Sequence, residues 1–476
     1  MSQTSFNDIL LNEFQLTPSS DQEQLFYKLE TFLRSTDGKQ LMVIQGYAGT
    51  GKTSSLGAFV RALKVLNIKT KLLAPTGRAA KVFSYKSKEE ALTIHKQIYR
   101  RKSKVDITSG MSLQPNLFKN TVFIVDEASM IGDYSLLKDG QISPRNLLED
   151  LFEYVYSGAN CKLILMGDDG QLPPVGSDFS PALSYEYLTN HFPTLKISTC
   201  KLSKVLRQSN DSEILRNATL LRSTSWESYP KFDLKPKTDL VRLMGYELQD
   251  ELESSYGRYG MDDSIVITRS NKAANAYNQQ IRARILWFEE LLCSGECLMV
   301  VKNNYFWMGD DTRMGFIANG ELIKVSRVVK IEEMYGFEFA HLIVSFPDYE
   351  GITDVEMIAH TEALTTDGPS LPRDRMKELF YAVEADYAHV REKKKRYEEI
   401  LSNPYFNALQ VKYAYAVTCH KSQGGQWSDV YIDQGYITEE MMGMDYYRWL
   451  YTALTRATNK AFFVNFADQF FEPEED

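Results

Sequence analysis

The amino-acid sequence predicts a multi-domain α/β protein with two parallel-sheet domains and a smaller β subdomain. Its 476 residues exceed what one hydrophobic core usually serves, so two or more domains are expected. From about 41 to 185, apolar strand-like runs alternate with helical patterns, as in a doubly wound parallel sheet. A second region of this kind spans about 186 to 290 and resumes near 405. Between these parts the pattern changes to short β-like runs.

Composition indicates a folded protein of the cytoplasm, or of the nucleoid in a bacterium. Hydrophobic residues make up 43% and charged residues 25% of the chain, which argues against disorder. No apolar run approaches the roughly 18 residues of a membrane span, and the start MSQTSFNDILLNEF lacks the basic region of a signal peptide. Five cysteines make no disulfide framework. The net charge of −9 argues against indiscriminate coating of nucleic acid, although it does not describe an individual groove.

The first element with chemical meaning is the segment 41 to 60, LMVIQGYAGTGKTSSLGAFV. An apolar strand-like run ends at Gly46, a glycine-rich loop follows, and Lys52 and Thr53 open a helical pattern. Backbone N–H groups of such a loop can close around phosphate oxygens at a helix N-terminus, where the helix dipole also favours anions. We expect Lys52 to reach the β- and γ-phosphates and Thr53 to hold Mg²⁺. The residues expected to bind the nucleotide here are Gly46, Ala48, Gly49, Thr50, Gly51, Lys52, Thr53 and Ser54.

The second element is the segment 121 to 130, TVFIVDEASM, a short β-branched strand that ends in two acids. Acids that follow a buried apolar strand need a reason to be there. Asp126 is expected to bind Mg²⁺, and Glu127 is expected to polarise the attacking water. Together with the phosphate-binding loop, this strand predicts an ATP or GTP hydrolase.

The third element is the segment 161 to 177, CKLILMGDDGQLPPVGS. Its apolar strand leads into Gly167 and Asp168, and Gln171 follows just before two prolines. The carboxyl ends of parallel strands gather at one edge of the sheet, where ligands bind. Gln171 is therefore a candidate sensor of the γ-phosphate and its water.

Further segments carry motifs, and together with the three segments above they are spread over nearly the whole chain. They are SSDQEQLF at 19 to 26, LLAPTGRAA at 72 to 80, ALTIHK at 91 to 96, KLSKVLRQS at 201 to 209, YAVTCHKSQGGQW at 415 to 427 and YTALTRAT at 451 to 458. With these segments the chain resembles the superfamily 1 helicases of the RecD/Dda-like branch. The resemblance implies two RecA-like domains, ATP with Mg²⁺ as cofactors, and single-stranded DNA and single-strand/duplex junctions as partners.

The resemblance also assigns residues around the nucleotide. Gln22 stands where the family reads the adenine edge, with Gln24 as an alternative, and Gly424 lines the turn towards the nucleotide. Arg207 and Arg456 stand where the family's arginines reach the γ-phosphate from the second domain. Such a pair supplies positive charge opposite the developing phosphate charge, so ATP binding would close the cleft between the domains.

A further set of residues is expected to contact phosphates and sugars of the DNA strand, so binding should be largely independent of base sequence. These residues are Pro75, Thr76, Arg78, Thr93, His95, Asn271, Thr418 and His420. Asn271 is assigned near the start of a helix, and a plain capped helix is the alternative. Cys419 lies beside His420, which raises the possibility of a thiol active site. In this family an aliphatic residue is more common at this position, so Cys419 is interpreted as a small core residue.

The predicted domain boundaries follow from these assignments. The first RecA-like domain covers 1 to 185, the second covers 186 to 294 and 401 to 476, and an SH3-like β-barrel covers 295 to 400. An inserted hairpin at 100 to 120 is either a strand-separating wedge or a surface loop. The basic run REKKKR at 391 to 396 is interpreted as a solvated helix face.

These observations predict an ATP-dependent DNA helicase that acts as a monomer on single-stranded DNA. The direction, 5′ to 3′, comes from the resemblance alone. The alternative is a DNA-stimulated ATPase that serves as a remodelling or loading subunit and unwinds little by itself. The sequence does not identify partners in replication or repair.

Overall fold

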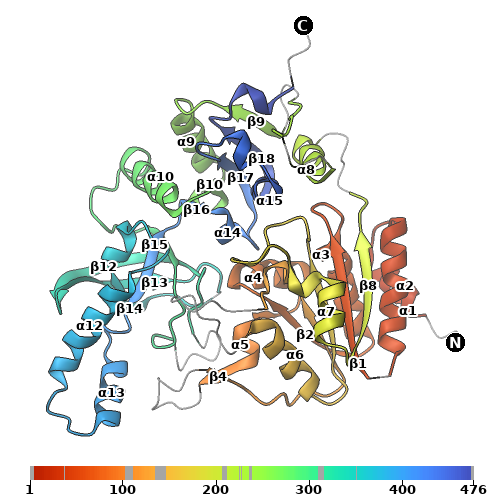
Figure 1. Cartoon of the computed structure of the whole chain (residues 1–476), viewed down its shortest axis with the longest axis horizontal. Coiled ribbons are helices and arrows are strands. Elements are labelled where there is room, and N and C mark those ends of the chain that lie inside the picture. The colour runs from red at the N-terminus through yellow and green to blue at the C-terminus, as the bar shows by residue number, and fades with distance from the viewer. Residues whose placement is uncertain are drawn as a thin grey trace.

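The computed structural model describes residues 5–36, 38–101, 111–133, 146–205, 212–223, 226, 228–234, 239–308, 316–349 and 351–472. Within these ranges the chain forms two open parallel sheets and one closed barrel, which lie around a common centre (Figure 1). This arrangement confirms the predicted fold class of two RecA-like domains with an inserted barrel.

The first sheet has six parallel strands in the order β3-β2-β6-β7-β1-β8. β6 and β7 are buried at every position, as expected for central strands that are covered on both faces. β8 lies beyond the boundary predicted at 185 and pairs with β1 along its whole length. The strands are β1 Lys39–Gly46, β2 Lys69–Ala74, β3 Ala91–Thr93, β6 Thr121–Val125, β7 Lys162–Gly167 and β8 Leu195–Leu202.

Helices cover both faces of this sheet because side chains alternate along each strand. In β1, Met42 and Ile44 pack with α1, α2 and α3, whereas Leu41 and Val43 pack with α6 and α7 on the other face. The helices are α1 Phe6–Phe14, α2 Ser20–Arg34, α3 Lys52–Val65, α4 Gly77–Ser87, α5 Ile94–Ile98, η2 Ala128–Met130, α6 Leu147–Ser157, η3 Pro181–Leu183 and α7 Tyr185–His191. The phosphate-binding loop, the acids after β6 and Gln171 after β7 therefore meet at one edge.

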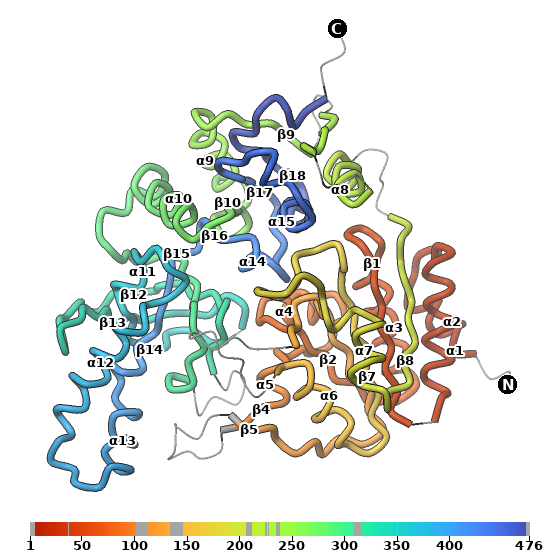
Figure 2. Tube along the Cα trace, viewed as in Figure 1, coloured from red at the N-terminus to blue at the C-terminus, as the bar shows by residue number. Residues whose placement is uncertain are grey.

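The second sheet has five parallel strands in the order β16-β10-β17-β18-β9. Its strands are β9 Leu240–Leu243, β10 Ser264–Thr268, β16 Ala416–Thr418, β17 Trp427–Asp433 and β18 Ala457–Val464. Its helices are α8 Glu213–Ser223, α9 Leu248–Tyr259, η4 Met261–Asp263, α10 Asn271–Arg284, α14 Cys419–Ser422, η5 Glu439–Met441, α15 Met444–Leu454 and η6 Asp468–Phe470. Figure 2 shows that α14 and α15, late in the chain, lie on the side of this body that faces the first domain.

The barrel is built from β11, β12, β13, β14 and β15, and it closes because β15 pairs with both β11 and β14. β15 lies after the boundary predicted at 400. The elements of this subdomain are β11 Cys297–Val300, β12 Leu322–Met334, β13 Phe337–Ser345, β14 Val355–His360, α11 Glu362–Thr365, α12 Arg373–Asp386, α13 Lys393–Ser402 and β15 Leu409–Tyr413. Most of the basic run at 391 to 396 is exposed at the start of α13, as a solvated face requires.

A two-stranded antiparallel pair, β4 Tyr99–Arg101 and β5 Met111–Leu113, lies within the predicted hairpin. The residues between these strands are outside the described part of the chain, so the wedge remains a prediction. All five cysteines are free thiols. Among the described residues, no helix combines the length and the apolar character needed to cross a membrane.

Candidate nucleotide site between the two sheet domains

A cavity of about 500 Å³ lies at the carboxyl edge of the first sheet and is also lined by the second domain. From the first domain the predicted residues in its wall are Gln22, Ala48, Gly49, Gly51, Lys52, Thr53, Ser54, Asp126, Glu127 and Gln171. The second domain contributes Gly424 and Arg456. The chain therefore brings most of the predicted nucleotide-binding residues to one place.

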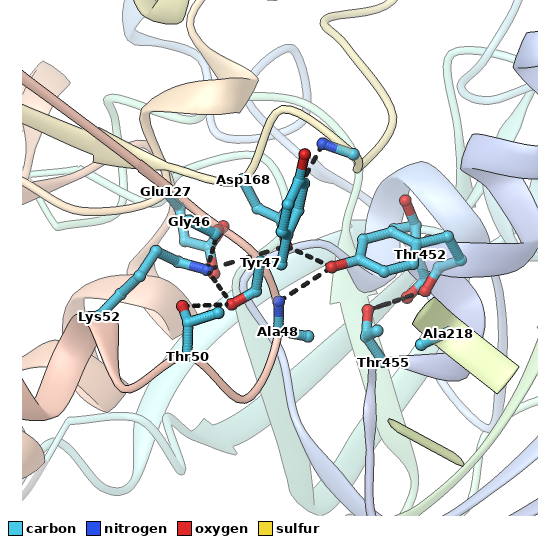
Figure 3. A network of polar contacts seen from close by, with 12 residues as sticks. Gly46, Tyr47, Ala48, Thr50, Lys52, Glu127, Asp168, Ala218, Thr452 and Thr455 are labelled. Atoms are coloured by element: carbon cyan, nitrogen blue, oxygen red, sulfur yellow. Dashed lines mark hydrogen bonds and ion pairs between the residues drawn. The ribbon is translucent and has the colours of Figure 1, made fainter. Parts of the chain in front are cut away.

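The phosphate-binding loop has the backbone that its glycines permit. Gly49 and Gly51 have φ angles of 78° and 79°, a region that residues with a side chain rarely adopt. α3 begins at Lys52, and no side chain caps its N-terminus, which leaves the first turn suited to an anion. The ammonium of Lys52 donates to the carbonyl oxygens of Gly46 and, at 2.9 Å, of Tyr47 (Figure 3). A phosphate would compete with these carbonyls for Lys52.

The two acids after β6 differ in their surroundings. Asp126 is buried, and its Oδ1 accepts a hydrogen bond of 2.8 Å from the backbone N–H of Glu127. Burial and the adjacent Glu127 carboxylate raise the pKa of Asp126 to about 7. A divalent cation at this carboxylate would offset both effects.

Thr53 and Asp126 fit Mg²⁺ because a hydroxyl and a carboxylate in one phosphate cavity are the oxygen ligands that this ion takes. Within the described residues no cluster of three or more His, Cys, Asp and Glu side chains is suited to a metal. The remaining ligands would then be phosphate oxygens and water. Such a site depends on the nucleotide for its completion.

Two further polar side chains face the cavity. Gln171 is 4% exposed, and its Oε1 accepts no hydrogen bond from the described residues, so this oxygen is available to accept one from a water. Gln22 is also buried, and its amide donates to Ser55 at 3.1 Å, whereas Gln24 is exposed. This difference favours Gln22 over Gln24 as the residue near the nucleotide.

Of the two arginines that were predicted to reach the γ-phosphate, only one lies within the described residues. Arg456 lines the cavity, and its guanidinium donates to the backbone oxygens of Thr452 at 3.0 Å and Gly425 at 3.3 Å. Arg207 lies outside the described residues, so its assignment remains a prediction.

Gly424 has a φ of 75°, and a Cβ there would lie 2.8 Å from the Ala79 Cβ.

Three of the predicted DNA-contacting residues are threonines at the starts of helices. Thr76 caps α4 by accepting from Ala79 N–H, and Thr93 caps α5 by accepting from Lys96 N–H, both at 3.2 Å. Thr418 precedes α14 without a capping bond. Pro75 lies directly before Thr76, between β2 and α4. These positions lie at strand ends of the two sheets, which was predicted for Pro75 and Thr76, and the caps give Thr76 and Thr93 a structural role as well.

The remaining predicted DNA contacts are more varied. Asn271 is the first residue of α10, and Ser270 rather than Asn271 caps that helix, at 3.1 Å from Ala273 N. Burial lowers the pKa of His95 and of His420. Both side chains are thus neutral at pH 7, and they would offer hydrogen bonds rather than charge to a phosphate.

Arg78 makes contacts that the sequence did not indicate. Its guanidinium lies 3.9 Å from the centre of the Trp427 ring and donates to the Gln426 carbonyl at 3.2 Å. Both partners belong to the second domain, so this residue of the first domain bridges the cleft. Desolvation lowers the pKa of Arg78.

The thiol of Cys419 is part of the core. It is 1% exposed, and its Sγ lies 3.4 Å from the Trp449 carbonyl oxygen. Burial raises the pKa of Cys419 to about 12, which keeps the sulfur protonated. The interpretation of Cys419 as a small core residue is confirmed.

Comparisons with known proteins match both halves of this site. A family model described as "AAA domain" matches residues 20–234, and one described as "UvrD-like helicase C-terminal domain" matches residues 413–464. The ATP-dependent RecD2 DNA helicase of Deinococcus radiodurans is 29% identical over 44% of this chain, and the ATP-dependent DNA helicase dda of Enterobacteria phage T4 is 26% identical over 60%. Both halves of this site are therefore similar to superfamily 1 helicases of the RecD/Dda-like branch.

The matches differ in extent. The matched region spans 25% of the RecD2 helicase and 63% of the Dda helicase. Among solved structures, the Pif1 helicase from Bacteroides in complex with ADP-AlF3 and single-stranded DNA has a TM-score of 0.47 and 14% identity. That match covers 96% of this chain and 95% of the Pif1 chain.

Several residues near the cavity were not predicted from the sequence. Tyr451 and Thr452 belong to the segment that provides Arg456, and Asp168 belongs to the segment that provides Gln171. These residues take part in contacts between segments that are far apart in the sequence, for example the 2.8 Å hydrogen bond from Leu172 N–H to the Thr452 hydroxyl. The only available signal was their place beside residues already assigned.

Proposed function

We propose that the chain is an ATP-dependent DNA helicase that moves 5′ to 3′ on single-stranded DNA. The observation that carries the proposal is a cavity beside the glycine-rich loop whose wall comes from both sheet domains. A ligand in such a cavity binds the closed arrangement better than the open one, so hydrolysis can drive a cycle of domain motion. The direction of movement is proposed from the family alone.

In this proposal each polar group in the cavity has one task. Lys52 binds the β- and γ-phosphates, and Thr53 and Asp126 hold Mg²⁺, which would neutralise charge on the phosphates. Glu127 takes the proton of the attacking water, and Gln171 orients that water. Arg456 stabilises the charge that develops on the γ-phosphate from the second domain.

Contacts across the cleft offer a route from nucleotide to DNA. The amide of Gln423 donates to the Leu172 carbonyl at 2.7 Å, directly after Gln171. Gln423 follows α14, and Thr418 and His420 lie at the start of that helix. A displacement of Gln171 would therefore be transmitted to the residues proposed to contact the DNA strand. Each sheet domain carries residues proposed to contact the DNA. Alternate opening and closing of the cleft between the domains would therefore move the DNA strand forward.

Strand displacement tests this function directly. Purified protein would be given duplexes with a 5′ tail, a 3′ tail or an RNA tail, and ATP hydrolysis would be measured alongside. We expect unwinding of the 5′-tailed DNA duplex. Equal or better unwinding from a 3′ tail would contradict the proposed direction. DNA-stimulated hydrolysis without unwinding of any duplex would instead favour the alternative, a remodelling or loading ATPase.

Lys52→Ala and Glu127→Gln provide the matched controls for this assay. Both variants should lose hydrolysis and unwinding together. Lys52→Ala removes the ammonium that binds the phosphates, and Glu127→Gln removes the carboxylate that takes the proton of the attacking water. Single-stranded DNA binding should persist in both. Unwinding by either variant would show that another site supplies the energy.

A further inference from the structure

The hydroxyl of Tyr451 joins the second domain to the phosphate-binding loop. Tyr451 lies on α15 and is 1% exposed. Its Oη accepts a hydrogen bond of 2.9 Å from Ala48 N–H and donates one of 2.7 Å to Oδ2 of Asp168. Burial and the Asp168 carboxylate raise the pKa of Tyr451 well above its usual range, so the hydroxyl keeps the proton that it donates. One atom thus contacts two segments of the first domain.

Asp168 extends this contact to the lysine of the loop. It is fully buried just after β7, where its Oδ1 accepts from Gly170 N–H at 3.0 Å. Its Oδ2 lies 3.8 Å from the Lys52 ammonium. Lys52 lines the cavity, whereas Asp168 and Tyr451 are not among its lining residues. Tyr451 therefore contacts the wall residue Ala48 directly and reaches Lys52 through Asp168.

Packing fixes the tyrosine ring as well as its hydroxyl. A Cβ at Gly170 would lie 3.3 Å from the Cε1 of Tyr451 and 3.2 Å from Asp168 Oδ1, so the glycine leaves room for this pair. The Arg222 side chain of α8 lies close by, with its Cδ 3.4 Å from the same Cβ position and its guanidinium 3.7 Å from the centre of the Tyr47 ring and 5.8 Å from that of Tyr451. Residues of both domains hold the ring in place.

We propose that Tyr451 is a positioning residue that transmits the nucleotide state of the phosphate-binding loop to the second domain. This inference rests on the proposed function. When Lys52 turns to a phosphate, Asp168 loses the ammonium 3.8 Å away, and the hydrogen bond from Tyr451 helps to compensate the charge of this carboxylate. α15 leads directly to Thr455 and Arg456 in the cavity wall. A tighter bond at Tyr451 therefore draws Arg456 towards the phosphates.

Tyr451→Phe tests this role, because it removes the hydroxyl and keeps the ring. We expect a roughly tenfold lower kcat for DNA-stimulated ATP hydrolysis, the size of one hydrogen bond to a charged group. The KM for ATP should change less than about twofold, since Tyr451 does not line the cavity. The control is Tyr447→Phe on the same helix, which loses a 2.7 Å bond to the Ser228 carbonyl inside the second domain. Its kcat should stay at the wild-type value.

A second readout measures the coupling itself. Single-stranded DNA affinity would be determined with and without a non-hydrolysable ATP analogue. The ratio of the two affinities measures the coupling between the sites, and it should move towards one in Tyr451→Phe. Asp168→Asn changes the same hydrogen bond from the other partner and should have the same effect on this ratio. A variant with wild-type thermal unfolding excludes a general loss of structure.

The outcomes separate the two proposals. If the wild type hydrolyses no ATP in the presence of DNA, the proposed function and this inference both fail. If the wild type is active and the affinity ratio is unchanged in both Tyr451→Phe and Asp168→Asn, only the inference fails. If Tyr451→Phe is destabilised, the ratio in Asp168→Asn decides. An equal loss of kcat in Tyr447→Phe would show a structural effect of the helix and would also overturn the inference.

Discussion

Gly424→Ala is expected to hold the two sheet domains apart. Gly424 has a φ of 75°, so any L residue there bears a backbone cost of about 1–2 kcal/mol. The new Cβ would lie 2.8 Å from the Ala79 Cβ and 3.1 Å from the Thr76 hydroxyl, both in the first domain. An ordinary contact between carbons is about 3.5 Å or more, so the domains must separate by roughly 0.7 Å or more.

This separation should affect turnover more than stability. Displacement of a catalytic group by about 1 Å can cost on the order of 100-fold in rate, so we expect kcat for DNA-stimulated hydrolysis to fall at least tenfold. Gly435→Ala is the matched control, because Gly435 has a φ of 65° in the same domain and no atom of the described residues lies within 4 Å of its added Cβ. It should show the backbone cost in thermal unfolding and keep wild-type turnover.

Steady-state ATP hydrolysis and thermal unfolding of both glycine variants would decide the matter. If Gly424→Ala matched Gly435→Ala in turnover, the contact with Ala79 would have no part in closing the site, and the reasoning from the built Cβ would be refuted. Loss of turnover in both variants would point to the backbone alone.

Three further predictions concern single groups. Lys52→Ala and Glu127→Gln should each lower hydrolysis at least 100-fold and leave single-stranded DNA affinity within about twofold in a binding titration, and weakened DNA binding would contradict separate sites. Burial raises the pKa of Asp126 from its ordinary value of 3.8 to about 7, so between these values the folded state holds a proton that the unfolded state has lost. This contribution to stability is lost as the pH rises from about 4 to about 7. Asp126→Asn should flatten that part of a plot of unfolding free energy against pH, and Mg²⁺ binding to the wild type should weaken below about pH 7; an unchanged plot would refute the burial argument. Cys419→Ala should keep turnover and cost about 1 kcal/mol of stability, while a maleimide should label Cys419 only on unfolding. Rapid labelling in the fold would be the contrary result.

The nucleotide half of the site was predictable because its residues lie close together in sequence. The loop from Gly46 to Ser54 carries its own strand, glycines and helix start, and the acids after β6 follow a strand that can only be buried. Gln171 required one more inference, that parallel strands end at a common edge. Short-range patterns were sufficient for each of these steps.

Contacts between distant segments could not be predicted in this way. Tyr451 and Asp168 are 283 positions apart, and Arg78 and Gln426 are 348 apart. Arg78 was predicted to bind DNA from its segment alone, and no pattern along the chain indicated the Trp427 ring beside it. The domain boundaries could not be predicted for the same reason. β8 completes the first sheet and β15 completes the barrel, and both the sheet and the barrel begin far upstream in the sequence.

The insertion of the barrel has a consequence for how the protein folds. β10 pairs with β16, so Thr268 and Thr418 must meet although 150 positions separate them. Closing a flexible loop of that length costs about 4.4 kcal/mol of chain entropy. If the barrel folds first, the pairing of β11 with β15 brings the two ends of the insertion together, and the remaining flexible loop is roughly 30 residues, with a cost of about 3.0 kcal/mol. We therefore expect the barrel to form before the second sheet and to speed its completion about tenfold.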